Sequence, residues 1–109
     1  MLFRSEDEAR DSGLPYFIVG HVGDGNFHIA YLLDPALPGE RELAESLNER
    51  VVRRALAVGG TCTGEHGIGL HKQGFLLEEA GADGVALMRR IKTALDPRQI
   101  MNPGKIFRG

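Results

Sequence analysis

The chain has 109 residues, a formal net charge of −2 and a single cysteine. Its length suits one domain, and charges of both signs without a basic patch argue against a nucleic-acid partner. No apolar run reaches the roughly 20 residues needed to cross a bilayer. The acidic N-terminus lacks a hydrophobic signal segment and Cys62 cannot form an internal disulfide, so we expect a reducing, cytoplasmic compartment.

The first half of the chain predicts a helix end, two strands and a long helix. Residues 1–11 are polar and are expected to form a tail or a helix end, which Gly13 and Pro15 terminate. β-Prone residues follow at 16–19 and 27–33. From residue 40 to residue 58 apolar side chains recur at spacings of three and four, which predicts a helix that stops at Gly59-Gly60. The apolar stripe of this helix is Leu43, Leu47, Val51, Ala55 and Val58.

The second half predicts a glycine-rich loop and two further helices. Residues 60–70 lack a helical period and are expected to run from a strand end into the loop, and a short helix over 73–80 closes at Gly81. A last helix, with Asp83 as N-cap, ends at Asp96-Pro97. Its stripe, expected to face the core, is Val85, Met88, Ile91 and Leu95. We therefore predict an α+β fold, a small antiparallel sheet whose hairpin is packed by helices, with residues 1–15 as a tail and 16–109 as the domain.

Two histidines flank the predicted hairpin turn. The sequence GHVGDGNFH occupies residues 20–28, and Asp-Gly between β-prone runs is typical of a two-residue turn. If Asp24 and Gly25 form that turn, His21 faces His28 on one side of the sheet, with Cβ atoms about 4.5–5.5 Å apart. Two imidazoles in this arrangement can hold a metal ion, although paired histidines need not do so. A register slip of one residue would turn one ring to the other face.

A glutamate and a histidine between glycines form the second candidate. Residues 61–69 have the sequence TCTGEHGIG, and flanking glycines let a backbone approach a ligand closely. In extended backbone Glu65 and His66 would point to opposite sides. Glu65 could then complete a two-histidine, one-carboxylate metal site, while His66 acts as a general base elsewhere. The alternative is a structural loop in which Glu65 caps a backbone amide and His66 is exposed.

Two nearby side chains have simpler interpretations. Cys62 is expected to be a packed small residue, because no base is placed beside it in the sequence. Lys72 could reach an anionic substrate, although a solvated lysine is the commoner outcome.

Three segments in this order resemble one family. They are residues 20–28, residues 60–69 and the sequence IMNPGKIF at residues 100–107. Together they resemble the C-terminal part of FAD-linked oxidases of the vanillyl-alcohol-oxidase type. The branch that they resemble contains the glycolate oxidase FAD subunit, D-lactate dehydrogenase and D-2-hydroxyglutarate dehydrogenase. The resemblance runs from about residue 16 to residue 107, and it is the combination of segments that is specific.

The resemblance implies a role for each matching residue. His21, His28 and Glu65 match the ligands of a divalent metal, Zn or Mn, and His66 matches the base that takes the hydroxyl proton. It also assigns Asn26 to the substrate and Asn102 to the FAD cofactor. From their positions in and after the glycine-rich loop, and not from the resemblance, we assign Gly67 to FAD and Lys72 to the substrate.

The implied reaction is the FAD-dependent oxidation of a 2-hydroxy acid of the D-lactate, glycolate or D-2-hydroxyglutarate type. The metal would lower the pKa of the substrate hydroxyl and orient it, while His66 removes the proton and hydride passes to the flavin. Family members carry an FAD-binding domain and most of the substrate cap upstream, and no phosphate-binding glycine-rich segment precedes Tyr16. We therefore expect a chain that is inactive alone, needs a missing FAD-binding domain or subunit, and could form a homo-oligomer.

Two other functions are open. The chain could be a stand-alone metal-binding module that uses His21, His28 and Glu65 without redox chemistry, or an inactive remnant. The Asn-Pro-Gly sequence at residues 102–104 favours the flavoenzyme, because a bare metal site does not require it.

Overall fold

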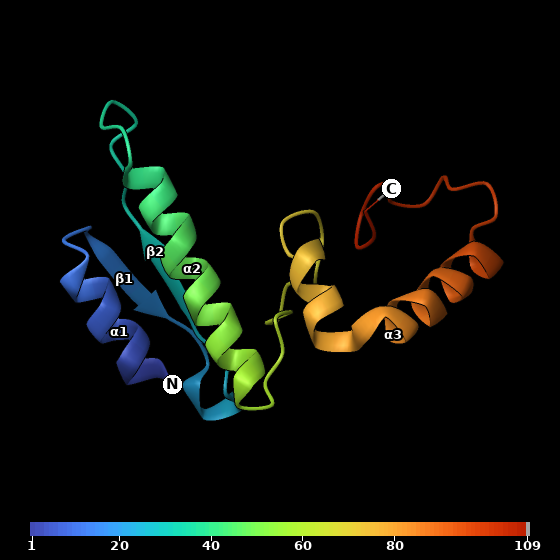
Figure 1. The fold of residues 1–109 in the computed structure, drawn as a ribbon, viewed down its shortest axis with the longest axis horizontal. Coiled ribbons are helices and arrows are strands. Elements are labelled where there is room, and N and C mark those ends of the chain that lie inside the picture. Colours follow the sequence, from blue (N-terminus) through green and yellow to red (C-terminus); the bar gives the residue numbers. More distant parts are fainter. Residues whose placement is uncertain (109) are drawn as a thin grey trace. The chain divides into compact units, whose positions relative to one another are not determined.

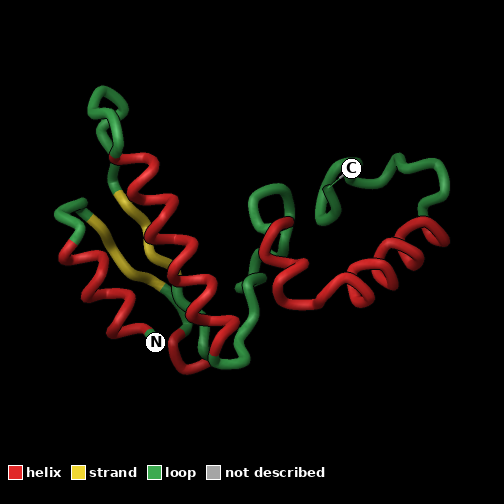
Figure 2. Tube along the Cα trace, in the orientation of Figure 1, coloured by secondary structure: helices red, strands yellow, loops and turns green. Residues whose placement is uncertain are grey.

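A computed structural model describes residues 1–108 of the chain, which divides into two compact units, Met1–Gly60 and Thr61–Gly109. Among the described residues, the first unit contains two α-helices, a 3-10 helix and a pair of strands, and the second contains one long α-helix that bends at Gly81. Loops precede and follow this last helix (Figures 1 and 2). This content confirms the predicted α+β class. In chain order the elements are α1 (Leu2–Asp11), β1 (Tyr16–Val19), the 3-10 helix η1 (Val22–Asp24), β2 (His28–Tyr31), α2 (Glu40–Ala57) and α3 (Gln73–Leu95).

The two strands form an antiparallel sheet with two distinct faces. Tyr16 pairs with Tyr31 and Val19 with His28, and directly opposed residues share a face. Tyr31 packs against the buried cluster of Leu14, Ala44 and Leu47, so its side of the sheet is the one that faces the helices. We call this the inner face; it carries Tyr16, Ile18, Ile29 and Tyr31. The outer face carries Phe17, Val19, His28 and Ala30, and Phe17 and Val19 remain 50% and 53% exposed.

Helix α2 has almost the predicted bounds, but its buried face matches the predicted stripe only in part. It begins at Glu40 and ends at Ala57, and Gly59 follows at a φ of +79°, where glycine is strongly favoured. The buried side chains are those of Ala44, Leu47 and Val52. Leu43 and Val58, both in the predicted stripe, are 38% and 70% exposed. Leu47 of the stripe is buried, and Val51 and Ala55 are half-buried. The buried face is shifted from the stripe, and α2 contacts both α1 and Tyr31 of the sheet.

Helix α1 is held to α2 by a partly buried ionic contact. Ser5 and Ala9 are fully buried, four residues apart, so both lie on one side of α1. Arg54 of α2 donates to Ser5 Oγ at 2.8 Å and to Glu8 Oε1 at 2.6 Å. Residues 2–11 are therefore an integral helix of the first unit.

Helix α3 is broken at the predicted position. Gly81 has a φ of 71° and a ψ of 169°, which no α-helix contains, so two helical segments meet there. The second segment does not bury the predicted stripe, because Met88, Ile91 and Leu95 are 36%, 53% and 76% exposed. Nothing in the described part of the second unit covers these side chains. Among residues 1–108 no helix combines the length and the apolar character that crossing a membrane requires.

Candidate functional site

The structure does not place His21 opposite His28. In the observed register His28 pairs with Val19, and His21 has already left the strand as the N-cap of the 3-10 helix. The carbonyl oxygen of His21 accepts the amides of Asp24 at 2.8 Å and Asn26 at 3.2 Å. The predicted two-residue turn is therefore wrong, and residues 20–27 form a longer connection in which His21 is exposed. His28 is half-buried at the start of β2.

Close backbone packing at Gly20 explains this longer connection. A Cβ atom on Gly20 would lie 2.5 Å from the Cα atom of Phe27 and 2.6 Å from the carbonyl oxygen of Asn26. Only glycine permits that approach. Gly25, at a φ of 74°, then ends the 3-10 helix and lets the chain return to β2. The Asp-Gly sequence does form a turn, but the turn closes on Val22 instead of joining the strands directly.

The residues around Glu65 and His66 form a tight turn and not a strand end. The Gly67 amide donates to the Thr63 carbonyl at 3.0 Å, with Gly64 and Gly67 at φ angles of 53° and 78°. Because the backbone is curled here, the two side chains do not diverge, as extended backbone would require. His66 Nε2 lies 3.4 Å from Glu65 Oε1, and their side chains are 74% and 49% exposed. The structure thus presents an imidazole and a carboxylate side by side at an accessible turn.

Lys72 closes the same loop. Its ammonium donates to the Thr63 carbonyl oxygen at 3.2 Å, and its amide donates to the Ile68 carbonyl oxygen at 3.3 Å. We define the glycine loop as residues 63–69. Lys72 therefore lies at the base of this loop, and its ammonium has a structural partner there.

Cys62 is buried and unreactive in character, as its sequence context predicted. Its amide donates to Glu79 Oε2 at 2.9 Å, and only 4% of the residue is exposed. Burial first, and then the hydrogen bond and negative charge of Glu79, raise the pKa of the thiol from 9.0 to about 11. A thiol with so high a pKa is a poor nucleophile at neutral pH.

Asp96 anchors the start of the C-terminal tail, which we define as residues 96–108. Its buried carboxylate accepts the amides of Ile100 and Met101, each at 3.0 Å. The ammonium of Lys92 contacts this carboxylate and also the carbonyl oxygen of Met101. The hydrogen bond from Lys92 is the main cause that lowers the pKa of Asp96. Asn102 follows at a φ of 46°, a conformation that asparagine tolerates well.

The anchoring role of Asp96 was missed in the sequence. Asp96 before Pro97 at a helix end predicts a helix stop. The same pattern is also a signal for a side chain that caps the amides that follow it.

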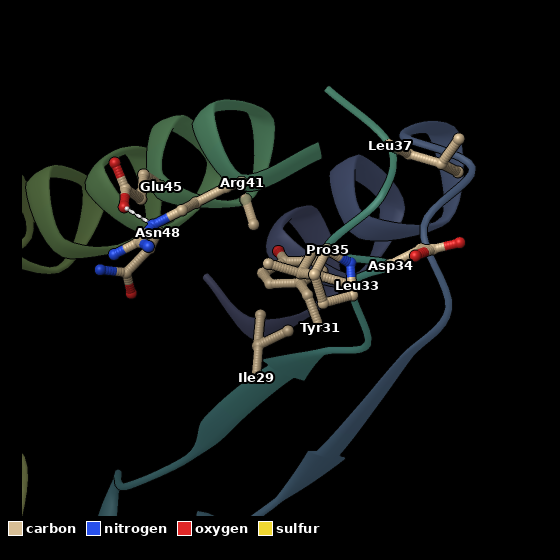
Figure 3. Close-up of a pocket in the computed structure, with 10 residues that line it drawn as sticks. Ile29, Tyr31, Leu33, Asp34, Pro35, Leu37, Arg41, Glu45 and Asn48 are labelled. Carbon is tan, nitrogen blue, oxygen red and sulfur yellow. Dashed lines mark hydrogen bonds and ion pairs between the residues drawn. The ribbon is translucent and has the colours of Figure 1, made fainter. Parts of the chain in front are cut away.

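A hollow of the first unit is lined by none of the predicted site residues. It has a volume of about 640 Å³ (Figure 3). Ile29 and Tyr31 of the inner face line it, whereas His28 belongs to the outer face. Its other lining residues are Leu33, Asp34, Pro35, Leu37, Arg41, Ala44, Glu45 and Asn48. This hollow is therefore distinct from the candidate metal ligands.

The donor atoms on each unit fit the chemistry expected of them. The first unit offers imidazoles, and the second offers an accessible carboxylate and an imidazole, which are ligand types suited to Zn or Mn. At Gly67 and Gly69 a Cβ atom would meet nothing within 4 Å, so the glycine loop presents open backbone to a ligand. Asn102 is exposed as well, and the residues assigned to FAD are therefore accessible.

Comparison with known proteins identifies the family. Residues 1–106 match the model of the C-terminal domain of FAD linked oxidases. The chain is 49% identical over 104 residues, 95% of its length, to the mitochondrial D-lactate dehydrogenase [cytochrome] of Kluyveromyces lactis, and covers 18% of that protein. It is 55% identical over 90 residues to a probable mitochondrial D-lactate dehydrogenase of Danio rerio (83% of the chain, 18% of the relative).

A bacterial relative extends the comparison. The chain is 41% identical over 88 residues to the glycolate oxidase subunit GlcD of Bacillus subtilis, with 81% of the chain and 19% of that protein covered. The chain thus spans about a fifth of the length of these relatives. With the family model matched over nearly all its residues, the chain belongs to the family of FAD linked oxidases, C-terminal domain.

Proposed function

We propose that the chain acts as the C-terminal part of a flavin-dependent 2-hydroxy-acid dehydrogenase, to which it contributes metal ligands and a general base. The match of residues 1–106 to the FAD-linked oxidase family carries this proposal. D-Lactate is the favoured substrate, because the two reported relatives named D-lactate dehydrogenase share 49% and 55% identity, against 41% for the glycolate oxidase subunit. Glycolate and D-2-hydroxyglutarate are the alternatives.

Each proposed residue has a defined task. His21, His28 and Glu65 bind the divalent metal, Zn or Mn, which supplies Lewis acidity when bound. His66 accepts the hydroxyl proton at its imidazole nitrogen, and its Nε2 atom lies 3.4 Å from the Glu65 carboxylate. Asn26 and Lys72 orient the substrate, and Asn102 and Gly67 lie beside the cofactor. FAD, which a domain outside this chain holds for the most part, supplies the two-electron oxidant when bound.

The observed geometry supports the ligand assignment in one respect and alters it in another. The pairing of His28 with Val19 places His28 on the outer face of the sheet, at a defined position in the strand. His21 lies in the connection between β1 and β2, outside the paired strands. Its position as a ligand therefore depends on the conformation of residues 20–27. We therefore expect metal binding to be more sensitive to the loss of His28 than to the loss of His21.

The first experiment measures bound metal. The purified chain is loaded with Zn²⁺ or Mn²⁺, and the affinity is measured by calorimetry for the wild type and four alanine variants. We expect His28→Ala and Glu65→Ala to weaken binding about 10-fold or more, and His66→Ala to retain it. His71→Ala is the matched control, because His71 is the one histidine outside the assignment. Unchanged affinity in both His28→Ala and Glu65→Ala would refute the ligand set.

The second experiment tests the base. This chain replaces the matching C-terminal segment of the Kluyveromyces lactis relative, and substrate-dependent bleaching of the flavin is followed by stopped flow. We expect His66→Ala to slow bleaching by 10²–10⁴-fold, the usual contribution of a general base, without loss of metal. His71→Ala should leave the rate unchanged. Undiminished bleaching in His66→Ala would remove the base assignment.

The other expectations remain part of the proposal. We expect the chain to need an FAD-binding domain or subunit for turnover, and it could form a homo-oligomer. A cytoplasmic location also stays a prediction, since two of the relatives above are named mitochondrial proteins. A stand-alone metal-binding module, the first alternative function, predicts metal binding. An inactive remnant, the second, predicts none. Both predict no flavin bleaching when this chain replaces the C-terminal segment of the relative.

A further inference from the structure

The C-terminal tail is held on both sides of Asn102. On the N-terminal side Asp96 and Lys92 fix Ile100 and Met101. On the C-terminal side the Gln73 amide nitrogen donates to the carbonyl oxygens of Gly104 at 2.8 Å and Phe107 at 3.4 Å. One side-chain amide at the first residue of α3 therefore bridges two points of the tail.

The bridged segment also contacts the glycine loop directly. The Ile106 amide donates to the Gly69 carbonyl oxygen at 2.8 Å, and Gly69 is the last residue of the loop that carries Glu65 and His66. Ile106, which lies between the two carbonyl groups that Gln73 binds, has a φ of 68°. That conformation is strained for a β-branched residue and persists only where surrounding contacts impose it.

A second group of contacts fixes the end of the tail on α3. The guanidinium of Arg89 lies over the Phe107 ring, 5.2 Å from its centroid, and also donates to the Arg108 carbonyl oxygen. The Arg108 guanidinium in turn packs on the first turn of α3, where a Cβ atom on Gly74 would lie 3.2 Å from it. The tail is thus folded back along α3, toward the glycine loop.

From these contacts we infer that Gln73 is a positioning residue. Its amide clasps residues 104–107, holds Ile106 in its strained conformation, and thereby joins the tail that carries Asn102 to the loop that carries His66. The inference rests on the proposed function for the roles of Asn102 and His66. Its physical purpose is pre-organisation, because small displacements of a base or of a group beside the cofactor reduce the rate of the chemical step strongly.

The first test asks whether the clasp between Gln73 and the tail exists. This test requires no cofactor. Gln73→Glu keeps the size of the side chain, removes both N–H donors and brings a carboxylate toward two carbonyl oxygens. We expect hydrogen exchange of the Ile106 amide in the 109-residue chain, measured by NMR, to accelerate about 10-fold or more. Gln99→Glu is the matched control, an exposed glutamine of the same tail, and should change this rate less than about twofold. Equal protection of the Ile106 amide in wild type and Gln73→Glu would overturn the clasp.

Two additional readouts separate the clasp from a general loss of structure. The introduced carboxyl regains a donor when it is protonated, so the effect of Gln73→Glu should shrink below a pH of about 4.3, whereas Gln99→Glu should show no such dependence. Adding Ile106→Gly removes the strain at the positive φ and should slow the exchange of the residue 106 amide relative to Gln73→Glu alone. An effect of Gln73→Glu that persists unchanged at low pH would indicate misfolding and would contradict the inference.

The second test asks whether the clasp positions the reacting groups. We use the Kluyveromyces lactis relative in which this chain replaces the matching C-terminal segment. There we expect Gln73→Glu to lower kcat for flavin bleaching about 10-fold with KM changed less than twofold, and Gln99→Glu to change neither. If His66→Ala abolishes bleaching but Gln73→Glu leaves kcat unchanged, the positioning role is wrong while the proposed function stands. If His66→Ala has no effect, the proposed function fails. The hydrogen-exchange measurement on the Ile106 amide then still decides whether the clasp exists.

Discussion

At the residue scale, the chemistry of the second unit depends on how each polar side chain is partnered. Glu65 and His66 are accessible and lie 3.4 Å apart, whereas Cys62 is buried beside Glu79. The same short stretch therefore holds one pair of groups open to ligands and one thiol kept out of reaction. Burial and partner, and not residue type alone, separate these two roles.

The pKa of Cys62 predicts an alkaline loss of stability. The folded thiol titrates at about 11 and an exposed thiol at 9.0, so the native state retains its proton while the unfolded state releases it. The resulting stabilisation is complete below pH 9 and is lost as the pH rises from 9 to about 11. The measurement is the free energy of unfolding between pH 8 and pH 11, compared with Cys62→Ser, which cannot titrate.

The expected difference in the free energy of unfolding between wild type and Cys62→Ser has a defined direction. Wild type should lose stability relative to Cys62→Ser across that window, and the difference between the two should be constant below it. Parallel curves over the whole range would contradict the raised pKa.

At the element scale, the connection between β1 and β2 decides where the histidines lie. The hairpin register pairs Val19 with His28 and leaves residues 20–27 as the connection. A two-residue turn at Asp24 and Gly25 would have given the pairing of His21 with His28. The observed register instead places His28 beside Val19 and Phe17 on the exposed outer face, away from the helices.

Gly20 is the residue on which this connection depends most. Gly20→Ala would bring a methyl group within 2.6 Å of two backbone atoms of Asn26 and Phe27, and we expect it to destabilise the chain by about 2–4 kcal/mol. Gly23→Ala is the matched control, because a Cβ atom there meets nothing within 4 Å and its φ is not positive. We expect that change to stay within about 1 kcal/mol of wild type. Urea unfolding midpoints of the three proteins provide the measurement, and equal midpoints for the two alanine variants would contradict the close packing.

At the scale of the whole molecule, the chain exposes apolar surface that its own described residues do not cover. The outer face of the sheet and the stripe of α3 are both exposed, with Leu95 at 76%. Monomeric proteins rarely leave large contiguous apolar patches in water. Because the chain spans 18% of each of the two D-lactate dehydrogenases compared above, we expect the remainder of such an enzyme to cover part of this surface.

Leucine substitutions in α3 test that expectation. Leucine and glutamine have similar helix propensities, so Leu95→Gln and Leu76→Gln differ mainly in burial, Leu76 being 7% exposed. In the 109-residue chain we expect Leu95→Gln to cost less than about 0.5 kcal/mol and Leu76→Gln about 3 kcal/mol.

In the Kluyveromyces lactis relative that carries this chain as its C-terminal segment, Leu95 is expected to be buried. Leu95→Gln should then destabilise the protein by about 1–3 kcal/mol. Thermal denaturation of both proteins and both variants gives the comparison. An equally small effect of Leu95→Gln in the two proteins would show that the stripe stays in contact with water.

The sequence by itself determined the family, the α+β class, the strand at residues 16–19, the bounds of α2 to within a residue and the break at Gly81. These features depend on local patterns, namely periodicity, glycine position and motif order, which act over a few neighbouring residues. The domain boundary at residue 16 and the roles of the site residues stay predictions.

Tertiary structure decided the rest. Close contact at Gly20 selected the longer connection over the two-residue turn, and the curled glycine loop brought Glu65 to His66 instead of separating them. Packing on α1 determined which face of α2 is buried, and Gln73 acquired its partners only when the tail folded back over about 30 residues. The contacts of α1 with α2 and of Gln73 with the tail join residues distant in the chain, so no local pattern encodes them. The connection at Gly20 and the glycine loop are local, but they depend on backbone approach and positive φ angles that residue type alone does not specify.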